Sequence, residues 1–431
     1  MTVSPDPTSV PGGSAAGAAT TARPGLWRGR ILIILGLLLL GIGLRYAVTG
    51  LSPLLTTVTS ELGIGTAGAT IIGMLPTLSF GIGGFVAPLI VRRIGPEGTA
   101  LVAVTMAAFG SLLRPFIDSP ALFMGLTFLA LLGMGFGNVV GAPLVKKHFP
   151  DRQATMVSAF TLLMQAGATL PAITAVPVSD TAGWRASLAS WGLISLLAIL
   201  PWTLILLRNR PNPNDSPTGT TRASAGGPQL GLAQILRSPV ALGTALFYAM
   251  ASLNIYAMLA WMPTILEDGF GLDKSGAASA FSVYTFMTLP MAVITPILAN
   301  KLRNPTLLAV LMAAVGPLGY LAMIFGVGPL WGAALIAGLA GGAFPLAIAM
   351  FNLRSRTPSG SAAVAGFAMG VGYLFGTLGP LLGGWLFSAT GDWTVPLWVY
   401  AATVFPMTVG AVSMAKPGRY IEDVLDTIHR G

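Results

Sequence analysis

Two residue types that often build functional sites are scarce in this chain of 431 residues, which contains no cysteine and only two histidines. The lack of cysteine excludes disulfides, thiolate metal sites and cysteine nucleophiles. The two histidines, His148 and His429, fall in a predicted loop and a predicted tail, away from the apolar segments. We therefore expect no metal site and no cofactor.

Charged side chains are also scarce, and this decides the class of the protein. They make up 9% of the residues, whereas 54% are hydrophobic and the mean hydropathy is +0.78. Because a soluble domain carries about 25% charged residues, the composition predicts a polytopic membrane protein surrounded by the lipid bilayer. The net charge of +9 does not indicate nucleic-acid binding, since the basic residues lie in short loops rather than in one patch.

Twelve apolar segments are long enough to cross a bilayer. Each must be helical there, because lipid offers the backbone no hydrogen-bond partner. The sequence therefore predicts an all-α membrane protein with 12 transmembrane helices. Their predicted limits are 31–54, 67–91, 98–117, 121–145, 154–177, 185–207, 239–264, 275–299, 305–326, 329–353, 361–388 and 394–415.

The distribution of Lys and Arg between the predicted loops indicates the orientation. Nineteen of them fall on the same side as the two termini, and only Arg114, Arg185 and Lys274 fall on the other side. Basic loops stay in the cytoplasm during insertion. Both termini are therefore predicted to be cytoplasmic, with the chain in the plasma membrane (the bacterial inner membrane).

A long polar segment divides the chain into two halves. Residues 1–26, rich in Pro, Gly, Ser, Ala and Thr, predict a disordered cytoplasmic tail. We expect an N-terminal six-helix bundle over 27–207, a cytoplasmic linker loop over 208–238, a C-terminal six-helix bundle over 239–415 and a cytoplasmic tail over 416–431. Two short apolar stripes predict surface helices: Leu230, Leu232, Ile235 and Leu236 before the seventh span, and Ile421, Val424, Leu425 and Ile428 in the tail.

The two halves repeat one another at a nearly constant offset of 208 to 210 residues. A constant offset along the whole chain indicates duplication. Parallel six-helix repeats joined by a central loop indicate the major facilitator fold, with a substrate site near the middle of the membrane between the halves. Residues at equivalent positions of the two halves are Pro53 and Pro263, Gly63 and Gly271, Pro88 and Pro296, Lys146 and Arg354, Gln165 and Tyr373, and Trp184 and Trp393.

Arg45 is the strongest candidate for a functional residue. It lies about halfway along the first apolar run, at a depth where a cation costs roughly 2.5–3.5 kcal/mol. All 14 acidic residues fall in tails or between apolar segments, so no protein carboxylate shares its depth. A guanidinium forks onto planar oxyanions, and we predict that Arg45 anchors the substrate. The alternative is a structural cation, satisfied by helix-end carbonyls or reaching outward along its stem.

Uncharged polar side chains in other spans are predicted to complete the substrate site. Asn254 is close to the repeat equivalent of that arginine, and Tyr256 follows two residues later. Gln165 and Tyr373 occupy equivalent positions in the fifth and eleventh spans. Asn138 lies within a Gly-x-x-x-Gly series whose glycines suit close helix packing. For each of them the structural alternative is an interhelical hydrogen bond, worth about 0.6 kcal/mol on average.

Four stretches spread over both halves carry a family resemblance: Leu44 to Leu55, Gly137 to Arg152, Leu259 to Leu266, and Gly372 to Trp393. They resemble one branch of the major facilitator superfamily, the cyanate-permease and nitroimidazole-transporter-like proteins. The resemblance implies a secondary transporter of small anions or small polar heteroaromatics. Two positions depart from the pattern, because Arg92 stands where the superfamily loop after the second span usually has Asp, and Met369 stands where this branch is expected to have Gln.

We predict a secondary active transporter that works by alternating access as a monomer. Intramembrane Asp, Glu and His are absent from the predicted spans, so we favour proton symport in which the substrate or a loop acid such as Glu61 carries the proton. A uniporter or exchanger is the other possibility for coupling. The first alternative function is a multidrug or antibiotic efflux carrier of the same fold, and the second is a non-transporting membrane sensor. An enzyme is not predicted, since no nucleophile–base pair or metal-ligand set lies in the spans.

Overall fold

The computed structural model describes residues 30–208 and 232–423, and every regular element within those ranges is helical. The predicted tail over 1–26, most of the predicted linker and the predicted surface helix from Val424 onward lie outside the described residues. The first half contains α1 (Ile31–Ile42), α2 (Tyr46–Thr49), η1 (Ser52–Leu54), α3 (Leu55–Glu61), α4 (Thr66–Leu113), η2 (Arg114–Phe116), α5 (Pro120–His148), η3 (Pro150–Arg152) and α6 (Gln153–Arg208).

The second half contains α7 (Leu232–Ile235), α8 (Pro239–Phe270), α9 (Lys274–Lys301), α10 (Thr306–Ile324), α11 (Pro329–Leu353), α12 (Pro358–Thr390), α13 (Thr394–Ala402) and α14 (Val404–Ala415). The stripe predicted to form a surface helix before the seventh span supplies α7, which is a single helical turn.

Ten helical segments among the described residues are long and apolar enough to cross a membrane, and two of these are about twice the ordinary length. The long segments α4 and α6 each pass through one glycine with a left-handed backbone, Gly95 with φ 76° and Gly183 with φ 82°. Such a backbone is strained for residues that carry a Cβ, so each glycine marks a tight turn between two helices. Divided at these turns, the segments correspond to the twelve predicted spans, and the predicted fold class is confirmed.

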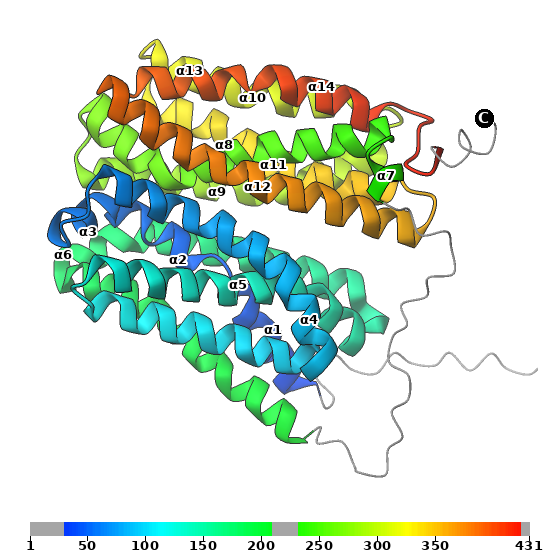
Figure 1. Cartoon of the computed structure of the whole chain (residues 1–431), viewed down its shortest axis with the longest axis horizontal. Helices are drawn as coiled ribbons and strands as arrows, with labels where there is room; N and C mark the ends of the chain where they lie inside the picture. The colour runs from blue at the N-terminus through cyan, green and yellow to red at the C-terminus, as the bar shows by residue number, and fades with distance from the viewer. Residues whose placement is uncertain (1–29, 209–231, 424–431) are drawn as a thin grey trace, which may run out of the picture.

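The two halves form the two layers of the bundle in Figure 1, with α1 to α6 in the lower layer and α8 to α14 in the upper one. We call the end of the bundle that holds Arg208 and Pro239 the terminal end, because the described ends of the chain gather there, at the right of the view. We call the opposite end, with the turns after Glu61 and Phe270, the far end.

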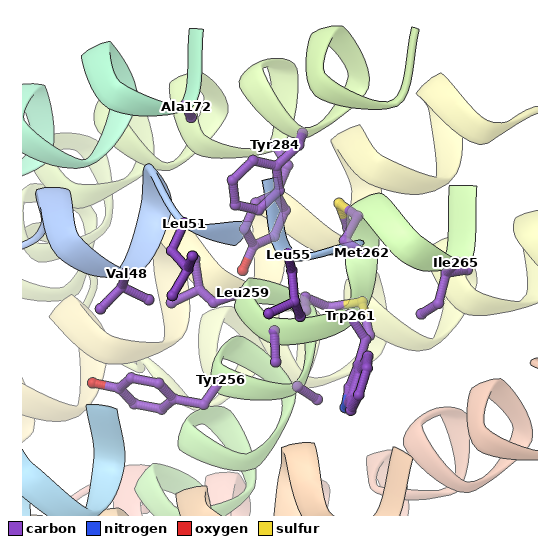
Figure 2. Close-up of a cluster of buried hydrophobic side chains, with 14 of the residues drawn as sticks. Val48, Leu51, Leu55, Ala172, Tyr256, Leu259, Trp261, Met262, Ile265 and Tyr284 are labelled. Carbon is purple, nitrogen blue, oxygen red and sulfur yellow. The ribbon is translucent and has the colours of Figure 1, made fainter. Parts of the chain in front are cut away.

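Over residues 30–208 and 232–423, the hydrophobic core is continuous between the halves only toward the far end. There one cluster combines Val48, Leu51 and Leu55 of the first half with residues of α8 such as Leu259 and Ile265, as Figure 2 shows. Toward the terminal end each half has a cluster of its own, with Ile34, Leu37, Val145 and Trp202 in the first half and Val240, Phe247, Met350 and Met414 in the second. The halves are therefore packed together at the far end and have separate cores at the terminal end.

Five hydrogen bonds between described residues join the halves between the middle of the bundle and the far end. They connect the first membrane segment with α8 and α9, α4 with α12, and α6 with α9. This distribution agrees with the shared core, and it indicates a molecule closed at its far end. The pairs are Thr56 with Glu267 (3.3 Å), Thr57 with Lys274 (3.0 Å), Thr77 with Thr377 (3.0 Å), Gln165 with Thr288 (2.9 Å) and Thr169 with the Thr285 carbonyl (3.4 Å).

Candidate functional site

Arg45 lies at a break in the first membrane-spanning segment. The single helix predicted over 31–54 is wrong in detail, because α1 ends at Ile42, α2 begins at Tyr46 and η1 begins at Ser52. Glycines at positions 41, 43 and 50 favour the break, since glycine weakens a helix by roughly 0.5–1 kcal/mol relative to alanine. Arg45 itself caps α2 with φ −131° and ψ −18°. Discontinuous helices near the membrane centre commonly form transporter binding sites.

The Arg45 side chain faces aromatic residues rather than acids. Its guanidinium carbon lies 6.0 Å from the centre of the Phe80 ring, at the outer limit of a cation–π contact. The hydroxyls of Tyr248, Tyr256 and Tyr373 lie within electrostatic range of the guanidinium. Among the described residues no carboxylate forms an ion pair with Arg45, and its Nε has no hydrogen-bond partner. Within the described part of the chain, Arg45 therefore has no counter-ion.

Three of these rings form a cluster that spans both halves. Phe80 comes from α4, whereas Tyr256 and Tyr373 come from α8 and α12. The ring centres lie 6.4 Å apart for Phe80 and Tyr256, 6.2 Å for Phe80 and Tyr373, and 6.4 Å for Tyr256 and Tyr373. All three pairs meet edge to face, with interplanar angles between 63° and 66°. The site therefore has aromatic walls contributed by both halves around one guanidinium.

Two hydroxyls beside Arg45 are buried without a hydrogen-bond partner among the described residues. These are the hydroxyls of Tyr256 and Tyr284. The Tyr256 hydroxyl lies close to the guanidinium, but no hydrogen bond of ordinary geometry joins the two groups. Figure 2 shows this hydroxyl pointing away from Trp261, toward the side on which Val48 lies. A buried, unsatisfied hydroxyl costs about 1–3 kcal/mol, so these groups are available to a ligand that enters the site.

Asn254, the predicted partner of Arg45 across the repeat, is instead used inside the second half. Its Nδ2 donates to the Met250 carbonyl and to Thr403 Oγ1, both at 2.8 Å. Its Oδ1 accepts from the Tyr320 hydroxyl at 2.8 Å, and the residue is 1% exposed. These bonds tie α8 to α10 and to the junction of α13 and α14. The geometry favours the structural alternative for Asn254.

The other predicted residues have different surroundings. Gln165 Nε2 donates to Thr288 Oγ1, so this side chain links α6 of the first half with α9 of the second. Asn138 on α5 is half-buried, and its Nδ2 has no partner among the described residues. It follows Gly137, which packs so closely on Leu44 that a Cβ there would lie 2.6 Å from that side chain. Of the predicted set, Tyr256 and Tyr373 thus lie near Arg45. Asn138 lies on α5, which packs against Leu44, the residue before Arg45.

A small cavity of about 30 Å³ lies on the far-end side of Arg45. Ser52 and Thr127 of the first half and Tyr256 of the second give it polar edges, and the Ser52 hydroxyl also has no partner among the described residues. A volume of that size holds about two water molecules. The remaining lining is Ala47, Val48, Leu51, Leu55, Ile72, Gly73, Pro76, Leu131, Leu259 and Ala260.

Four contributors near this site were not predicted from the sequence: Phe80, Tyr248, Tyr284 and Arg114. The aromatic residues carry no signal that separates a site from ordinary core packing. Arg114 was predicted on the outer side, at the end of the span over 98–117, but it begins η2 and is only 1% exposed. The nearest carboxylate in the sequence, Asp118, pairs with Arg185 at 3.0 Å instead, which leaves the Arg114 side chain to turn into the bundle.

Known proteins share this architecture. The chain is 31% identical over 383 residues to the 2-nitroimidazole transporter of Escherichia coli (strain K12), with 86% of this chain and 92% of that protein covered. It is 23% identical over 375 residues to the cyanate transport protein CynX of the same organism, with 86% and 93% covered. The crystal structure of a D-xylose-proton symporter superposes with a TM-score of 0.67 at 15% identity, covering 90% of this chain and 98% of that one.

The sequence profile of the Major Facilitator Superfamily matches residues 31–378, which is most of the chain. This match agrees with the twelve spans and the two-layered bundle. The resemblance to the cyanate- and nitroimidazole-transporter-like branch is confirmed by the two Escherichia coli relatives. The chain therefore belongs to the Major Facilitator Superfamily, a family of membrane transporters for small solutes.

Proposed function

We propose that the protein is a secondary active transporter that carries a small planar anion, or a small polar heteroaromatic solute, by alternating access between its halves. The observation that carries the proposal is the Arg45 guanidinium, which lacks a protein counter-ion among the described residues and faces Phe80, Tyr248, Tyr256 and Tyr373. The substrate supplies the missing negative charge or electron-rich polar group.

The chemistry of the site supports this class of substrate. A guanidinium forms two parallel hydrogen bonds with a carboxylate or a nitro-like group of the same planar geometry. The edge-to-face rings of Phe80, Tyr256 and Tyr373 leave flat apolar walls on which a heteroaromatic ring packs favourably. The hydroxyls of Tyr256 and Tyr284 supply uncharged donors. Relatives described as transporters of 2-nitroimidazole and of cyanate act on solutes of this size.

The position of the closed end supports a transport cycle. If the termini are cytoplasmic, as the basic loops predict, the far end faces outward and the molecule is in a conformation open toward the cytoplasm. Transport then requires the contacts at Thr56, Thr57 and Thr77 to break and the terminal ends of the halves to meet. We place the protein in the plasma membrane on the same reasoning.

An efflux carrier for uncharged aromatic drugs is the second candidate, and the aromatic cluster is the observation in its favour. The two functions differ in what they require of Arg45. A small anion needs the guanidinium, whereas a bulky neutral drug needs mainly the rings. Cationic drugs are disfavoured by either arrangement, because a fixed positive charge lies in the site.

Ligand-induced thermal stabilisation of the detergent-purified protein tests the proposal. Cyanate, nitrate, formate, benzoate and 2-nitroimidazole are compared with a cationic dye on wild type, Arg45→Lys and Arg45→Gln. A ligand at a hundred times its dissociation constant adds about 2.7 kcal/mol to the free energy of unfolding. We expect one of the first five to stabilise wild type, to act weakly on Arg45→Lys and to have no effect on Arg45→Gln.

The matched control is Lys301→Gln, which removes an exposed positive charge at the end of α9. It should respond to ligand like wild type. Equal stabilisation of wild type and Arg45→Gln by the same anion would refute the role of Arg45. Stabilisation by the cationic dye alone would refute the proposed substrate class.

A further inference from the structure

The break in the first membrane segment leaves backbone groups that need partners. A membrane-embedded chain must satisfy its carbonyls internally, because lipid supplies no donors. One such carbonyl is that of Ala47, in the single-turn helix α2. It accepts a hydrogen bond at 3.3 Å from Nη2 of Arg114, which begins η2 at the end of α4. The guanidinium therefore acts on the backbone two residues after Arg45.

Arg114 is held in place by uncharged groups. Its Nη1 donates to Thr127 Oγ1 of α5 at 3.3 Å, and its guanidinium carbon lies 5.9 Å from the centre of the Phe123 ring. The residue is 1% exposed, and its Nε has no partner among the described residues. No carboxylate of the described part of the chain forms an ion pair with it. Burying an arginine in this way is costly, so its contacts must matter to the fold or to the site.

Tyr46 anchors the same segment from the neighbouring position. Its hydroxyl lies 3.0 Å from Ser111 Oγ of α4 and 2.9 Å from Ser195 Oγ of α6, inside the first half. Tyr46 is 1% exposed and directly follows Arg45, whose side chain meets residues of the second half. The two adjacent side chains thus lie in different surroundings. Tyr46 and Arg114 together attach α2 to the first half, and this attachment leaves Arg45 directed at the aromatic cluster.

We infer that Arg114 is a positioning residue for the substrate site: its bond to the Ala47 carbonyl fixes the broken segment and thereby the direction of the Arg45 side chain. This inference rests on the proposed function only for its consequence, which is substrate affinity. The geometric part is independent of any substrate. Arg114 does not line the small cavity beside Tyr256, so its effect on a ligand passes through its two partners, the backbone of α2 and the Thr127 side chain.

The absence of cysteine from the chain makes a direct test of this geometry simple. A single cysteine introduced as Arg45→Cys reports where side chain 45 points, through its rate of modification by a small anionic methanethiosulfonate reagent. The rate is measured with Arg114 intact and with Arg114→Met or Arg114→Lys. We expect Arg114→Met to slow modification by at least about tenfold, the ratio given by about 1.4 kcal/mol. Arg114→Lys keeps a donor for the carbonyl and should restore much of the rate.

Two further variants keep the test decisive. Thr127→Val serves if Arg114→Met does not fold, because it removes one partner of Arg114 without removing the charge of Arg114. It should slow modification by a smaller factor than Arg114→Met. Arg185→Gln removes an exposed cation at the same end of the bundle and should leave the rate unchanged. Equal rates in the Arg114→Met, Thr127→Val and parent proteins would overturn the inference.

Binding by the protein with Arg45 intact separates this inference from the proposed function. With benzoate and 2-nitroimidazole as probes, Arg114→Met should raise the Kd of whichever probe binds wild type by about tenfold. Arg114→Lys should recover most of the affinity, which a general loss of stability would not explain. If no probe binds wild type, the proposed substrate class fails, and the modification rates still decide the role of Arg114. If a probe binds wild type, an unchanged Kd in Arg114→Met would overturn the positioning role of Arg114.

Discussion

Removal of the Tyr256 hydroxyl should change stability and affinity in opposite directions. In Tyr256→Phe the ring remains, so its packing against Phe80 and Tyr373 is kept. The lost hydroxyl is buried and has no hydrogen-bond partner among the described residues, and such a group costs about 1–3 kcal/mol. The hydroxyl still interacts with Arg45, so its removal should recover only the lower part of this range. We expect the free energy of unfolding without ligand to rise by about 1 kcal/mol.

Substrate affinity should fall in the same variant. A hydrogen bond to a charged group contributes about 1.5–3 kcal/mol, which corresponds to roughly a 10- to 150-fold higher Kd for an anionic ligand. Both quantities are measured on one detergent preparation, with thermal unfolding in the absence of ligand and calorimetric titration with the best-binding probe. This combination of signs is typical of a side chain kept for binding at a cost to stability.

Tyr320→Phe is the matched control for this prediction. It removes the same atom from a tyrosine whose hydroxyl donates to Asn254 at 2.8 Å, away from Arg45. We expect a loss of about 1 kcal/mol in stability and no change in Kd. The reasoning about Tyr256 is refuted if Tyr256→Phe behaves like this control, losing stability while binding the probe as wild type does.

Three further outcomes follow from other parts of the molecule. Gln165→Ala removes a bond to Thr288 between the halves, so closure of the far end should weaken by about 1 kcal/mol, seen as a larger open fraction in spin-label distance measurements. Gly95→Ala forces a side chain onto a backbone with φ 76° and should lower the unfolding free energy by about 1–2 kcal/mol, whereas Gly84→Ala, in open space inside α4, should raise it by about 0.5–1 kcal/mol. Burial raises the pKa of the Glu422 carboxyl, but hydrogen bonds from backbone N–H groups and a threonine hydroxyl lower it more, to below its ordinary value of 4.5. Through these bonds, from Arg356 and Thr357, Glu422 docks the segment after α14 against the start of α12. This docking should be complete above that pH and be lost as the pH falls below it, measured as faster proteolysis near Glu422, with Glu422→Gln showing no such transition.

The spans and the buried, unpaired position of Arg45 could be predicted because lipid imposes strong rules. A bilayer requires long apolar helices, so twelve apolar runs predict the fold with little ambiguity. The same medium makes an isolated cation costly, so Arg45 is conspicuous in the sequence. The repeat between the halves then indicates which spans of the second half face the site, and Tyr256 and Tyr373 of those spans do lie beside Arg45.

The rest of the site depends on how each helix is rotated, which the sequence does not reveal. In a membrane the lipid-facing and core-facing sides of a helix are both apolar, so hydrophobic periodicity does not distinguish them. Asn254 and Tyr256 are two residues apart on α8, yet one is bonded within its own half and the other meets Arg45. Arg114 was missed because its position beside Pro115, at the end of an apolar run, is equally compatible with an exposed turn.

The shared core at the far end has a consequence for the energy of the transport cycle. Opening that end exposes large side chains such as Leu51, Leu55 and Ile265, and re-exposing each fully buried one costs about 1.5–3 kcal/mol. Transport at a useful rate requires the two end states to be nearly equal in free energy, so a comparable apolar area has to become buried at the other end. Phe85 on α4, 75% exposed, already lies 3.9 Å from where a Cβ at Gly370 of α12 would be. If the halves alternate as proposed, the sequence has to carry two apolar contact surfaces of matched area that are buried in turn.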